Sequence, residues 1–398
     1  MTILLRGGTV ITQDSDRRVF RGDVFIQDGV IIHIEEKCSR VADVVIDARD
    51  KIVIPGIINS HVHLGESVYM PMIASRLPLD EYLQQTESLA SRNSKYVEGS
   101  RDIVAGYTLA QHVRSGVTTL AGGRTAAVAE RYGVRNVSGY MLMNYGKLGK
   151  YSTGIEEQFE NELRMHSSSL TSHALFIHSL ATVGPSELSV AQKLLDRHPE
   201  CRLMAHIAET RDIVTRVREH YGSSELDTLD RYGFLNDRFL AVHACYLAPS
   251  ELRRLRDSGA YVAHCLTSNM ASSSRTLDRQ DMSALGDARV LATDGVVTSG
   301  TFSLLEEASY GYRYHNRYAA QDWLTAQQVL DEITIKPAKA LGLDGITGSI
   351  EVGKRADIVV LDLGVTTSID SAVRQLIHYA QTVSIQTVII DGAIVLFE

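Results

Sequence analysis

The chain has 398 residues, of which 44% are hydrophobic and 22% are charged, and this composition is typical of a globular protein. Its length suits one large domain with a smaller appendage, because a single hydrophobic core stops growing near roughly 250–300 residues. A formal net charge of −8 without a run of Lys and Arg argues against a nucleic-acid-binding surface, and no stretch approaches the ~20 apolar residues that cross a bilayer.

The N-terminal segment MTILLRGGTVITQDSD lacks a small-residue cleavage site, and its apolar part is too short for a secretory signal. The four cysteines lie far apart and include no Cys-x-x-Cys pair, which argues against a disulfide framework or a zinc knuckle. They are Cys38, Cys201, Cys245 and Cys265. We therefore expect small buried thiols and a cytoplasmic protein.

Short strands with tight turns are predicted at both ends of the chain. The first part contains the β-branched runs ILLRGGTVIT, DVFIQDGVIIHIEE and DVVIDARDKIVIPG, and the last part contains GSIEVGKRADIVVLDL and VSIQTVIIDGAIVLFE. The tripeptides RGG, QDG and IDG lie between such runs, which is typical of hairpin turns. Neither end alone has enough strands to bury a sheet face. We therefore predict one small β-sandwich assembled from residues 1–55 and 345–398.

The middle of the chain, residues 56–344, alternates short apolar runs with amphipathic segments. Two of these segments, PSELSVAQKLLDRH and APSELRRLRDSGA, carry Pro-Ser at the start and a Glu in the first turn, which predicts helices. The eight apolar runs are IIN at 57–59, VTTLAG at 117–122, RNVSGY at 135–140, ALFIH at 174–178, LMAHIA at 203–208, FLAVH at 239–243, YVAHC at 261–265 and RVLAT at 289–293. Eight strand–helix units predict an α/β fold of the (β/α)8 TIM-barrel type. A doubly wound sheet is the alternative, but no Gly-x-Gly-x-x-Gly follows an early strand.

Ionisable side chains recur near the ends of these runs. They are His61, His63, His178, His206, His243 and Asp294. In a (β/α)8 barrel the carboxyl ends of all strands converge on one face, where active sites are built. A single buried histidine is commonly part of a core, but recurrence at the same phase of successive units predicts a functional site.

His61 and His63 form a His-x-His pair at the end of the first run. On an extended strand, residues i and i+2 point to the same side, so both imidazoles can reach one cation. His206 adds a third imidazole and Asp294 a carboxylate, a donor set that suits one divalent metal, Zn²⁺ first and Fe²⁺ or Mn²⁺ as alternatives. Such a metal lowers the pKa of a bound water and makes hydroxide available as the nucleophile. Asp294 can also accept a proton from the attacking water.

Glu209 and His243 are candidate acid–base groups. Glu209 lies three residues beyond His206, where its carboxyl can protonate a ring nitrogen of a substrate and later pass a proton to a departing amine. The alternative is that Glu209 only interacts favourably with the partial positive charge at the start of a helix. His243 can polarise the oxygen of a tetrahedral intermediate as a hydrogen-bond donor, or it can merely support a ligand.

These motifs resemble the amidohydrolase superfamily, and within it the chlorohydrolase/deaminase branch of triazine hydrolases and adenosine- or adenosylhomocysteine-type deaminases. The matching segments are collinear over nearly the whole chain: IPGIINSHVHL, SGVTT, MAHIAET, AVHACYL, AHCLTSN, ATDG and KPAKALGL followed by GSIEVGKRADIVVLD. The resemblance implies a metal on the His-x-His pair, His206 and Asp294. It also implies that Glu209 shuttles protons, that His243 orients the nucleophile or polarises the substrate, and that His178 contacts the substrate.

The resemblance further implies one metal rather than two. Binuclear relatives carry a bridging carboxylated lysine on the fourth barrel strand. The ALFIH segment has no lysine, and Lys193 falls inside the helix that follows.

The loops depart from the pattern of that branch, so the substrate stays open. Leu266 stands where relatives usually have a proline, and Ser303 stands where they often have an acidic residue. The loop after His63 supplies the following side chains in place of a tryptophan-rich lid: Glu66, Tyr69, Arg76 and Tyr82. Of these, Glu66 and Tyr69 are candidates to contact a ribose or a ring substituent.

We expect hydrolytic deamination of an amino-substituted nitrogen heterocycle, such as a purine, pterin, pyrimidine, triazine or a nucleoside of one. One alternative keeps the site and changes the leaving group, to chloride from a chlorotriazine or to an amine from a cyclic amide or imidazolone. Another is a barrel that has lost catalysis and serves as a scaffold, although none of the predicted ligands or acids is missing. We expect a small-molecule substrate as partner and a homodimer as the assembly.

Overall fold

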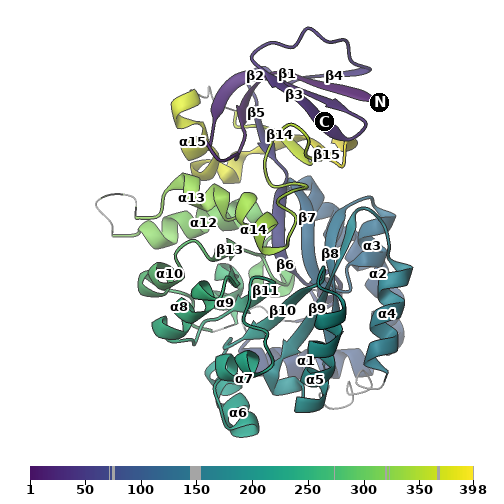
Figure 1. Ribbon diagram of the computed structural model, residues 1–398, viewed down its shortest axis with the longest axis vertical. Helices are drawn as coiled ribbons and strands as arrows, with labels where there is room; N and C mark the ends of the chain where they lie inside the picture. The colour runs from purple at the N-terminus through teal and green to yellow at the C-terminus, as the bar shows by residue number, and fades with distance from the viewer. Residues whose placement is uncertain are drawn as a thin grey trace.

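The computed structural model describes residues 1–70, 72–73, 77–143, 154–272, 274–318, 321, 323–364 and 368–397. It consists of a barrel and, at one end of the barrel, a sheet that holds both chain termini (Figure 1). In Figure 1 the purple N-terminal strands and the yellow C-terminal segment lie together above the teal and green barrel. Segments from the two ends of the sequence are thus neighbours in space.

Eight parallel strands form the barrel, in the chain order that the apolar runs predicted. They are β6 (Ile57–Val62), β7 (Val117–Gly123), β8 (Arg135–Leu142), β9 (Thr171–Ser179), β10 (Arg202–Ile207), β11 (Phe239–His243), β12 (Tyr261–His264) and β13 (Arg289–Leu291). An isolated parallel bridge between Val62 and Asp294 joins the first strand to the segment after the last one, and the Asp294 N–H donates to the His61 carbonyl (3.0 Å). The (β/α)8 prediction is therefore confirmed, and the doubly wound alternative is wrong.

Side chains alternate along the barrel strands between the interior and the helices. In β10, Met204 lies in the interior cluster together with Phe176 of β9, whereas Leu203 and Ala205 pack on the helical side. All four side chains are buried. His206 follows Met204 by two residues, so it points into the barrel near the carboxyl end of the strand.

The α-helices surround the barrel or follow its last strand. They are α1 (Leu79–Arg92), α2 (Ser94–Arg114), α3 (Ala126–Arg131), α4 (Ile155–Met165), α5 (Pro185–Arg197), α6 (Arg211–Tyr221), α7 (Glu225–Arg231), α8 (Pro249–Asp257), α9 (Leu266–Ala271), α10 (Arg279–Leu285), α11 (Val296–Ser299), α12 (Leu304–Asn316), α13 (Ala326–Asp331), α14 (Ile335–Ala340) and α15 (Ala372–His378). The two helices predicted from Pro-Ser openings are confirmed as α5 and α8. Their first-turn glutamates cap them, because Glu187 accepts from the Gly184 N–H (2.9 Å) and Glu251 accepts from the Ala248 N–H (2.8 Å).

Both ends of the chain build one eight-stranded mixed sheet, which confirms that the smaller β-structure is assembled from both termini. Its strands are β1 (Thr2–Ile11), β2 (Val19–Gln27), β3 (Val30–Glu35), β4 (Val44–Asp47), β5 (Ile52–Pro55), β14 (Ile358–Asp362), β15 (Ser384–Ile390) and β16 (Ala393–Phe397). The strand order is β16-β15-β14-β5-β1-β2-β3, with β4 paired to β1. The sheet curls, because an antiparallel bridge joins Val30 to Arg355 just before β14. It encloses aliphatic side chains such as Ile3, Val24 and Ile358.

Two of the three predicted hairpin turns are confirmed and one is wrong. QDG joins β2 to β3, and IDG joins β15 to β16. RGG lies inside β1, where the pairing with β2 shifts register between Leu5 and Gly8. Gly7 takes a left-handed φ of 74° and donates its N–H to Asp23 (2.7 Å). The two glycines therefore form a bulge that bends the strand instead of reversing it.

A buried arginine ties the barrel to the terminal sheet. Arg135, at the start of β8, donates to both carboxylate oxygens of Asp357 (2.6 and 3.1 Å) and to Asp391 (3.0 Å). The side chain of Arg135 is 3% exposed and that of Asp357 is fully buried. Arg355 also pairs with Asp391, so two arginines and two aspartates form one network between the two parts of the molecule.

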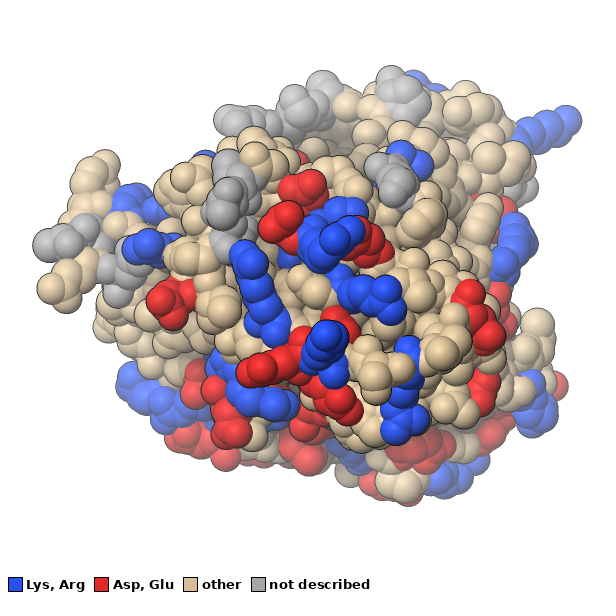
Figure 2. Space-filling view, turned by 90° about the horizontal axis from the view of Figure 1, so that it is seen from above, with Lys and Arg blue, Asp and Glu red and all other residues tan. Residues whose placement is uncertain are grey.

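Charged side chains of both signs are interspersed over the end of the molecule that carries the terminal sheet, as Figure 2 shows. That face therefore presents mixed charge rather than a field of one sign. Within the described ranges, no helix is both long enough and apolar enough to cross a membrane.

Candidate metal centre

Four of the predicted site residues converge near the carboxyl ends of the barrel strands. They are His61, His63, His206 and Asp294, and one possible ligand atom of each lies within 4.8 Å of all the others. The Nε2 atom of His61 lies 3.0 Å from Nε2 of His63 and 3.1 Å from Nε2 of His206. Oδ1 of Asp294 lies 3.4 Å from Nε2 of His61 and 3.2 Å from Nε2 of His63.

The hydrogen bonds around these histidines aim unshared electron pairs at one point. Nδ1 of His206 lies 2.7 Å from the carbonyl oxygen of His178, which can only accept, so the ring proton sits on Nδ1 and Nε2 carries a lone pair. Nδ1 of His63 lies 3.4 Å from the Glu66 carboxylate, which favours the same tautomer. Facing lone pairs repel one another unless a proton or a cation lies between them. Three imidazoles and one carboxylate therefore fit a divalent transition metal.

The three histidines of the cluster differ in their pKa, since burial lowers that of His61 to about 4 and holds that of His206 well below its usual value. Burial lowers the pKa of His63, but the surrounding carboxylates, first that of Glu66, outweigh this effect and raise the pKa to about 9. Burial alone raises the pKa of Asp294, yet hydrogen bonds with His61 and His63 hold it well below its usual value. The neutral imidazoles of His61 and His206 and the ionised carboxylate of Asp294 are the forms in which these side chains bind a metal.

Three barrel strands end in left-handed backbone at this centre. Ala208 after β10, His243 at the end of β11 and Asp294 after β13 have φ angles of 45°, 71° and 64°. A residue other than glycine adopts this conformation at a cost of order 1–3 kcal/mol. The turn at Ala208 is held by Glu225, whose carboxyl group accepts the Ala208 N–H through Oε2 (2.5 Å). Glu209 follows Ala208 directly in the chain, so the conformation of this turn sets the position of the Glu209 Cα and the direction of its side chain.

Glu209 and His243 face each other beside the four donors. Nε2 of His243 lies 3.8 Å from Oε1 of Glu209, and both side chains are buried. Asn269 holds His243, because its Oδ1 accepts from Nδ1 of the imidazole (2.8 Å). Burial raises the pKa of the Glu209 carboxyl, and the neighbouring His243 only partly opposes this. A carboxyl of raised pKa is suited to carrying a proton to and from a substrate.

His178 and Glu66 lie next to the metal donors. The ring centre of His178, near the end of β9, lies 5.5 Å from that of His206, and burial lowers the pKa of His178 to about 4. Glu66 contacts His63 through one carboxylate oxygen and accepts the Tyr82 hydroxyl through the other (2.9 Å). Substrate contact by His178 or Glu66 stays a prediction.

Tyr69 lies in a small apolar cluster with Val68 and Val97, and only 6% of it is exposed. Its predicted contact with substrate is not tested by this placement. Arg76 lies outside the described residues.

Three supporting residues were not predicted from the sequence. Ser268, in α9, donates its hydroxyl to Oδ2 of Asp294 (2.5 Å), and Asn269 beside it holds His243. The AHCLTSN motif was the signal available for both. Glu225 has no such signal, because its contact joins α7 to a turn that lies elsewhere in the sequence.

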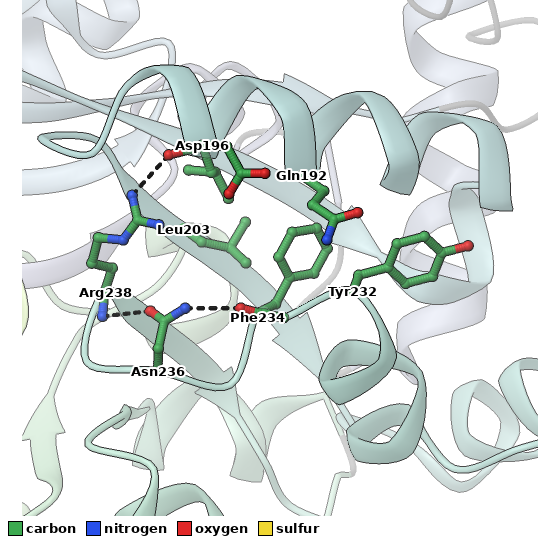
Figure 3. Close-up of a pocket in the computed structure, with 9 residues that line it drawn as sticks. Gln192, Asp196, Leu203, Tyr232, Phe234, Asn236 and Arg238 are labelled. Atoms are coloured by element: carbon green, nitrogen blue, oxygen red, sulfur yellow. Dashed lines mark hydrogen bonds between the residues drawn. The ribbon is translucent and has the colours of Figure 1, made fainter.

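A small cavity lies at the opposite end of the barrel. It is lined by α5, the start of β10 and the loop before β11, through Gln192, Leu195, Asp196, Leu203, Tyr232, Gly233, Phe234, Asn236 and Arg238. Arg238 donates to the Leu195 carbonyl (3.0 Å). Figure 3 shows Asn236 beside Arg238, where its Oδ1 accepts the Arg238 main-chain N–H (2.9 Å). Its volume of about 20 Å³ is close to that of a single water position. Its place at the amino ends of the strands is typical of stability rather than catalysis.

The chain is similar to known proteins over almost its whole length. It is 29% identical to the 5-methylthioadenosine/S-adenosylhomocysteine deaminase of Pyrococcus furiosus, over 100% of this chain and 95% of that protein. It is 28% identical to the 5'-deoxyadenosine deaminase of Methanosarcina mazei, over 99% of this chain and 92% of that protein. The crystal structure of an adenosine deaminase from Xanthomonas campestris with bound zinc matches with a TM-score of 0.87 and 26% identity, over 99% of this chain and 93% of that chain.

The family model described as the amidohydrolase family matches residues 52–395. This range contains the His-x-His strand, the turn that carries Glu209 and the segment that carries Asp294. The resemblance inferred from the motifs is thereby confirmed, and the chain belongs to the amidohydrolase family.

Proposed function

We propose that this chain is a metal-dependent hydrolytic deaminase that releases ammonia from an amino-substituted nitrogen heterocycle. The observation that carries the proposal is the placement of Glu209, a buried carboxyl of raised pKa beside His243 and four converging metal donors. Hydrolytic removal of a ring amino group needs an activated water and a group that protonates first the ring and then the amine. This site supplies candidates for both tasks.

One divalent metal is proposed on His61, His63, His206 and Asp294, with zinc as the first candidate and iron or manganese as alternatives. When bound, such a metal supplies the Lewis acidity that makes water a nucleophile near neutral pH. The Ser268 hydroxyl donates to Oδ2 of Asp294 (2.5 Å), which leaves Oδ1 directed at the imidazoles of His61 and His63. Strand β9 carries no lysine that could bridge a second ion, which supports a single metal.

In this proposal, Glu209 donates a proton to the ring nitrogen beside the amine-bearing carbon, which makes that carbon more electrophilic. The Asp294 carboxylate accepts a proton from the attacking water. Glu209, now ionised, takes the second proton of that water from the hydroxyl on the attacked carbon and delivers it to the departing amine, and the proton held by Asp294 then restores Glu209. His243, held at Nδ1 by Asn269, turns Nε2 toward the reacting centre, where it contacts the oxygen that attacks the ring.

The names of the relatives indicate which substrates should be tested first. The three proteins compared above are described as deaminases of adenosine, 5'-deoxyadenosine, 5-methylthioadenosine or S-adenosylhomocysteine. We therefore propose 5'-substituted adenosines as the first substrate class, ahead of free purines, pterins, pyrimidines and triazines.

The test is ammonia release by zinc-loaded protein across this panel, with chloride and ring-opened products measured in parallel. A Glu209→Gln variant keeps the shape of the side chain and removes its transferable proton. It should lose roughly 10²–10⁴-fold in kcat while keeping its metal content. Glu200→Gln, which changes an exposed glutamate that contacts His198, is the matched control and should keep full activity. Full turnover by Glu209→Gln contradicts the mechanism, and chloride or ring-opened product without ammonia selects the other leaving group.

A further inference from the structure

Glu66 bridges a proposed metal ligand and a helix that supplies no ligand. It lies in the short 3₁₀ helix η1 (Leu64–Tyr69), which follows the His-x-His pair directly. One carboxylate oxygen lies 3.4 Å from Nδ1 of His63, and the other accepts the hydroxyl of Tyr82 (2.9 Å). Tyr82 belongs to the first turn of α1 and is only 7% exposed. One hydrogen bond and one ion-pair contact thus connect α1 to the metal centre.

The surroundings leave room for the Glu66 carboxylate at this place. Gly295 follows Asp294 directly, and a Cβ at Gly295 would lie 2.9 Å from Oε2 of Glu66. A larger side chain there would therefore crowd the same oxygen that accepts the Tyr82 hydroxyl. The absence of a side chain next to Asp294 fits a carboxylate held in this position.

The three histidines of the centre are held in different ways. Nδ1 of His206 donates to a main-chain carbonyl, which the barrel itself fixes. Nδ1 of His61 has no hydrogen-bond partner among the described residues. Among the described residues, His63 is the one of the three whose Nδ1 faces a side chain. That side chain is Glu66, which is in turn held by Tyr82 from another element.

We propose that Tyr82 and Glu66 form a relay that orients His63 toward the metal, so that the affinity of the centre for its metal depends on the position of α1. A carboxylate that accepts the outer N–H of a ligating histidine fixes its tautomer and makes it a stronger donor. Tyr82 acts through Glu66, because its hydroxyl holds one oxygen and leaves the other directed at His63. Both are positioning residues. The inference rests on the metal centre of the proposed function, and it gives Glu66 a role other than contact with substrate.

The test measures metal affinity rather than activity. Metal-free protein is titrated with Zn²⁺, and separately with Co²⁺, against a chelator of known affinity. Glu66→Gln should weaken binding by roughly 10–100-fold, and Tyr82→Phe should weaken it by a smaller factor, of order 3–10-fold. Combining the two should weaken binding no further than Glu66→Gln alone, because the tyrosine acts only through the carboxylate. The Co²⁺ absorption spectrum should change in both single variants.

Two matched controls come from residues outside the cluster of metal donors. Glu130→Gln alters another carboxylate that contacts a histidine, since Glu130 lies 2.8 Å from Nδ1 of His166. Tyr140→Phe removes another buried tyrosine hydroxyl, which donates to Gln158 (2.8 Å). Both controls should bind Zn²⁺ within about twofold of the unaltered protein.

Unchanged Zn²⁺ affinity in Glu66→Gln and Tyr82→Phe, or losses that add in the double variant, would overturn the relay. Because Tyr82→Phe removes a single oxygen, it stays informative if the Glu66 variant does not fold. Failure of the proposed function would give a different result from failure of the relay. A chain that binds zinc through the relay and yet releases no ammonia from any substrate keeps this inference and loses the deaminase.

Discussion

Replacing Arg135 by methionine should destabilise the protein more than any surface ion-pair change. Methionine keeps the apolar length of the side chain but leaves Asp357 and Asp391 without their shared cation. Asp357 is fully buried, so its charge then has no compensating partner on the barrel side. Removing one partner of a buried ion pair costs about 3–5 kcal/mol, mostly because of the charge that is left behind.

The control is an arginine that also bridges two aspartates but on the surface. Arg254 contacts Asp227 (2.6 Å) and Asp230 (2.5 Å), and 40% of its side chain is exposed. Exposed pairs are worth at most about 1 kcal/mol, so Arg254→Met should cost less than that. Equilibrium denaturation of the metal-free proteins, followed by circular dichroism and by the fluorescence of the single tryptophan, measures both losses.

A second substitution separates the cost of the lost contacts from the cost of the unpaired charge. Asp357→Asn in the Arg135→Met background removes the buried charge. In the unaltered protein, Oδ1 of Asp357 accepts the Asp391 N–H (2.7 Å), and the amide oxygen of an asparagine can still do so. The double variant should therefore recover part of the stability lost in Arg135→Met. The reasoning is refuted if Arg135→Met costs no more than Arg254→Met, or if Asp357→Asn deepens the loss.

Three further predictions concern the metal, a buried carboxyl and two glycines. Chelation should abolish ammonia release, and one equivalent of Zn²⁺ per chain should restore it; a requirement for two equivalents would contradict the single-metal site. Burial raises the pKa of Glu225 from 4.5 to about 8, so the folded chain keeps this proton over that range and loses stability as pH rises through it. The free energy of unfolding of Glu225→Gln, measured relative to that of the unaltered protein, should therefore rise between pH 5 and pH 9, by up to about 5 kcal/mol in denaturant titrations. The same difference at both pH values would count against this prediction. Gly122→Ala should cost about 3 kcal/mol or more, because its Cβ would lie 2.2 Å from the Val62 carbonyl oxygen, whereas Gly99→Ala in α2 meets open space and should gain about 1 kcal/mol; thermal melts that rank the two alike would refute this.

The sequence predicts those parts of the molecule in which a local pattern is repeated by the architecture. Each barrel strand is a short apolar run, and the parallel arrangement places every carboxyl end on one face. The period of two at the end of β6 brings His61 and His63 to the same side, and the convergence of the carboxyl ends on one face adds His206 and Asp294. These four residues could therefore be grouped before any coordinates existed.

The rest depends on contacts between segments that are distant in the sequence. RGG has the composition of a turn, but pairing with β2 makes it a bulge. Glu66 was predicted to face a substrate because it follows the His-x-His pair, and its contact with Tyr82 appears only once α1 is packed beside η1. The hydrogen bond from Ala208 to Glu225 likewise needs α7 to lie behind the turn after β10. Periodicity carries no information about such pairs.

The left-handed backbone at Ala208, His243 and Asp294 has a consequence for how the molecule opens. Each of these residues regains a cost of order 1–3 kcal/mol when its turn relaxes, so the catalytic rim needs less free energy to open than the opposite rim of the same strands. Amide hydrogens at the two rims should accordingly exchange with solvent at different rates, faster around the metal donors than around the amino ends of β10 and β11. Local opening of the barrel would then occur first at the carboxyl ends of the strands, the side on which a metal ion and a substrate have to enter.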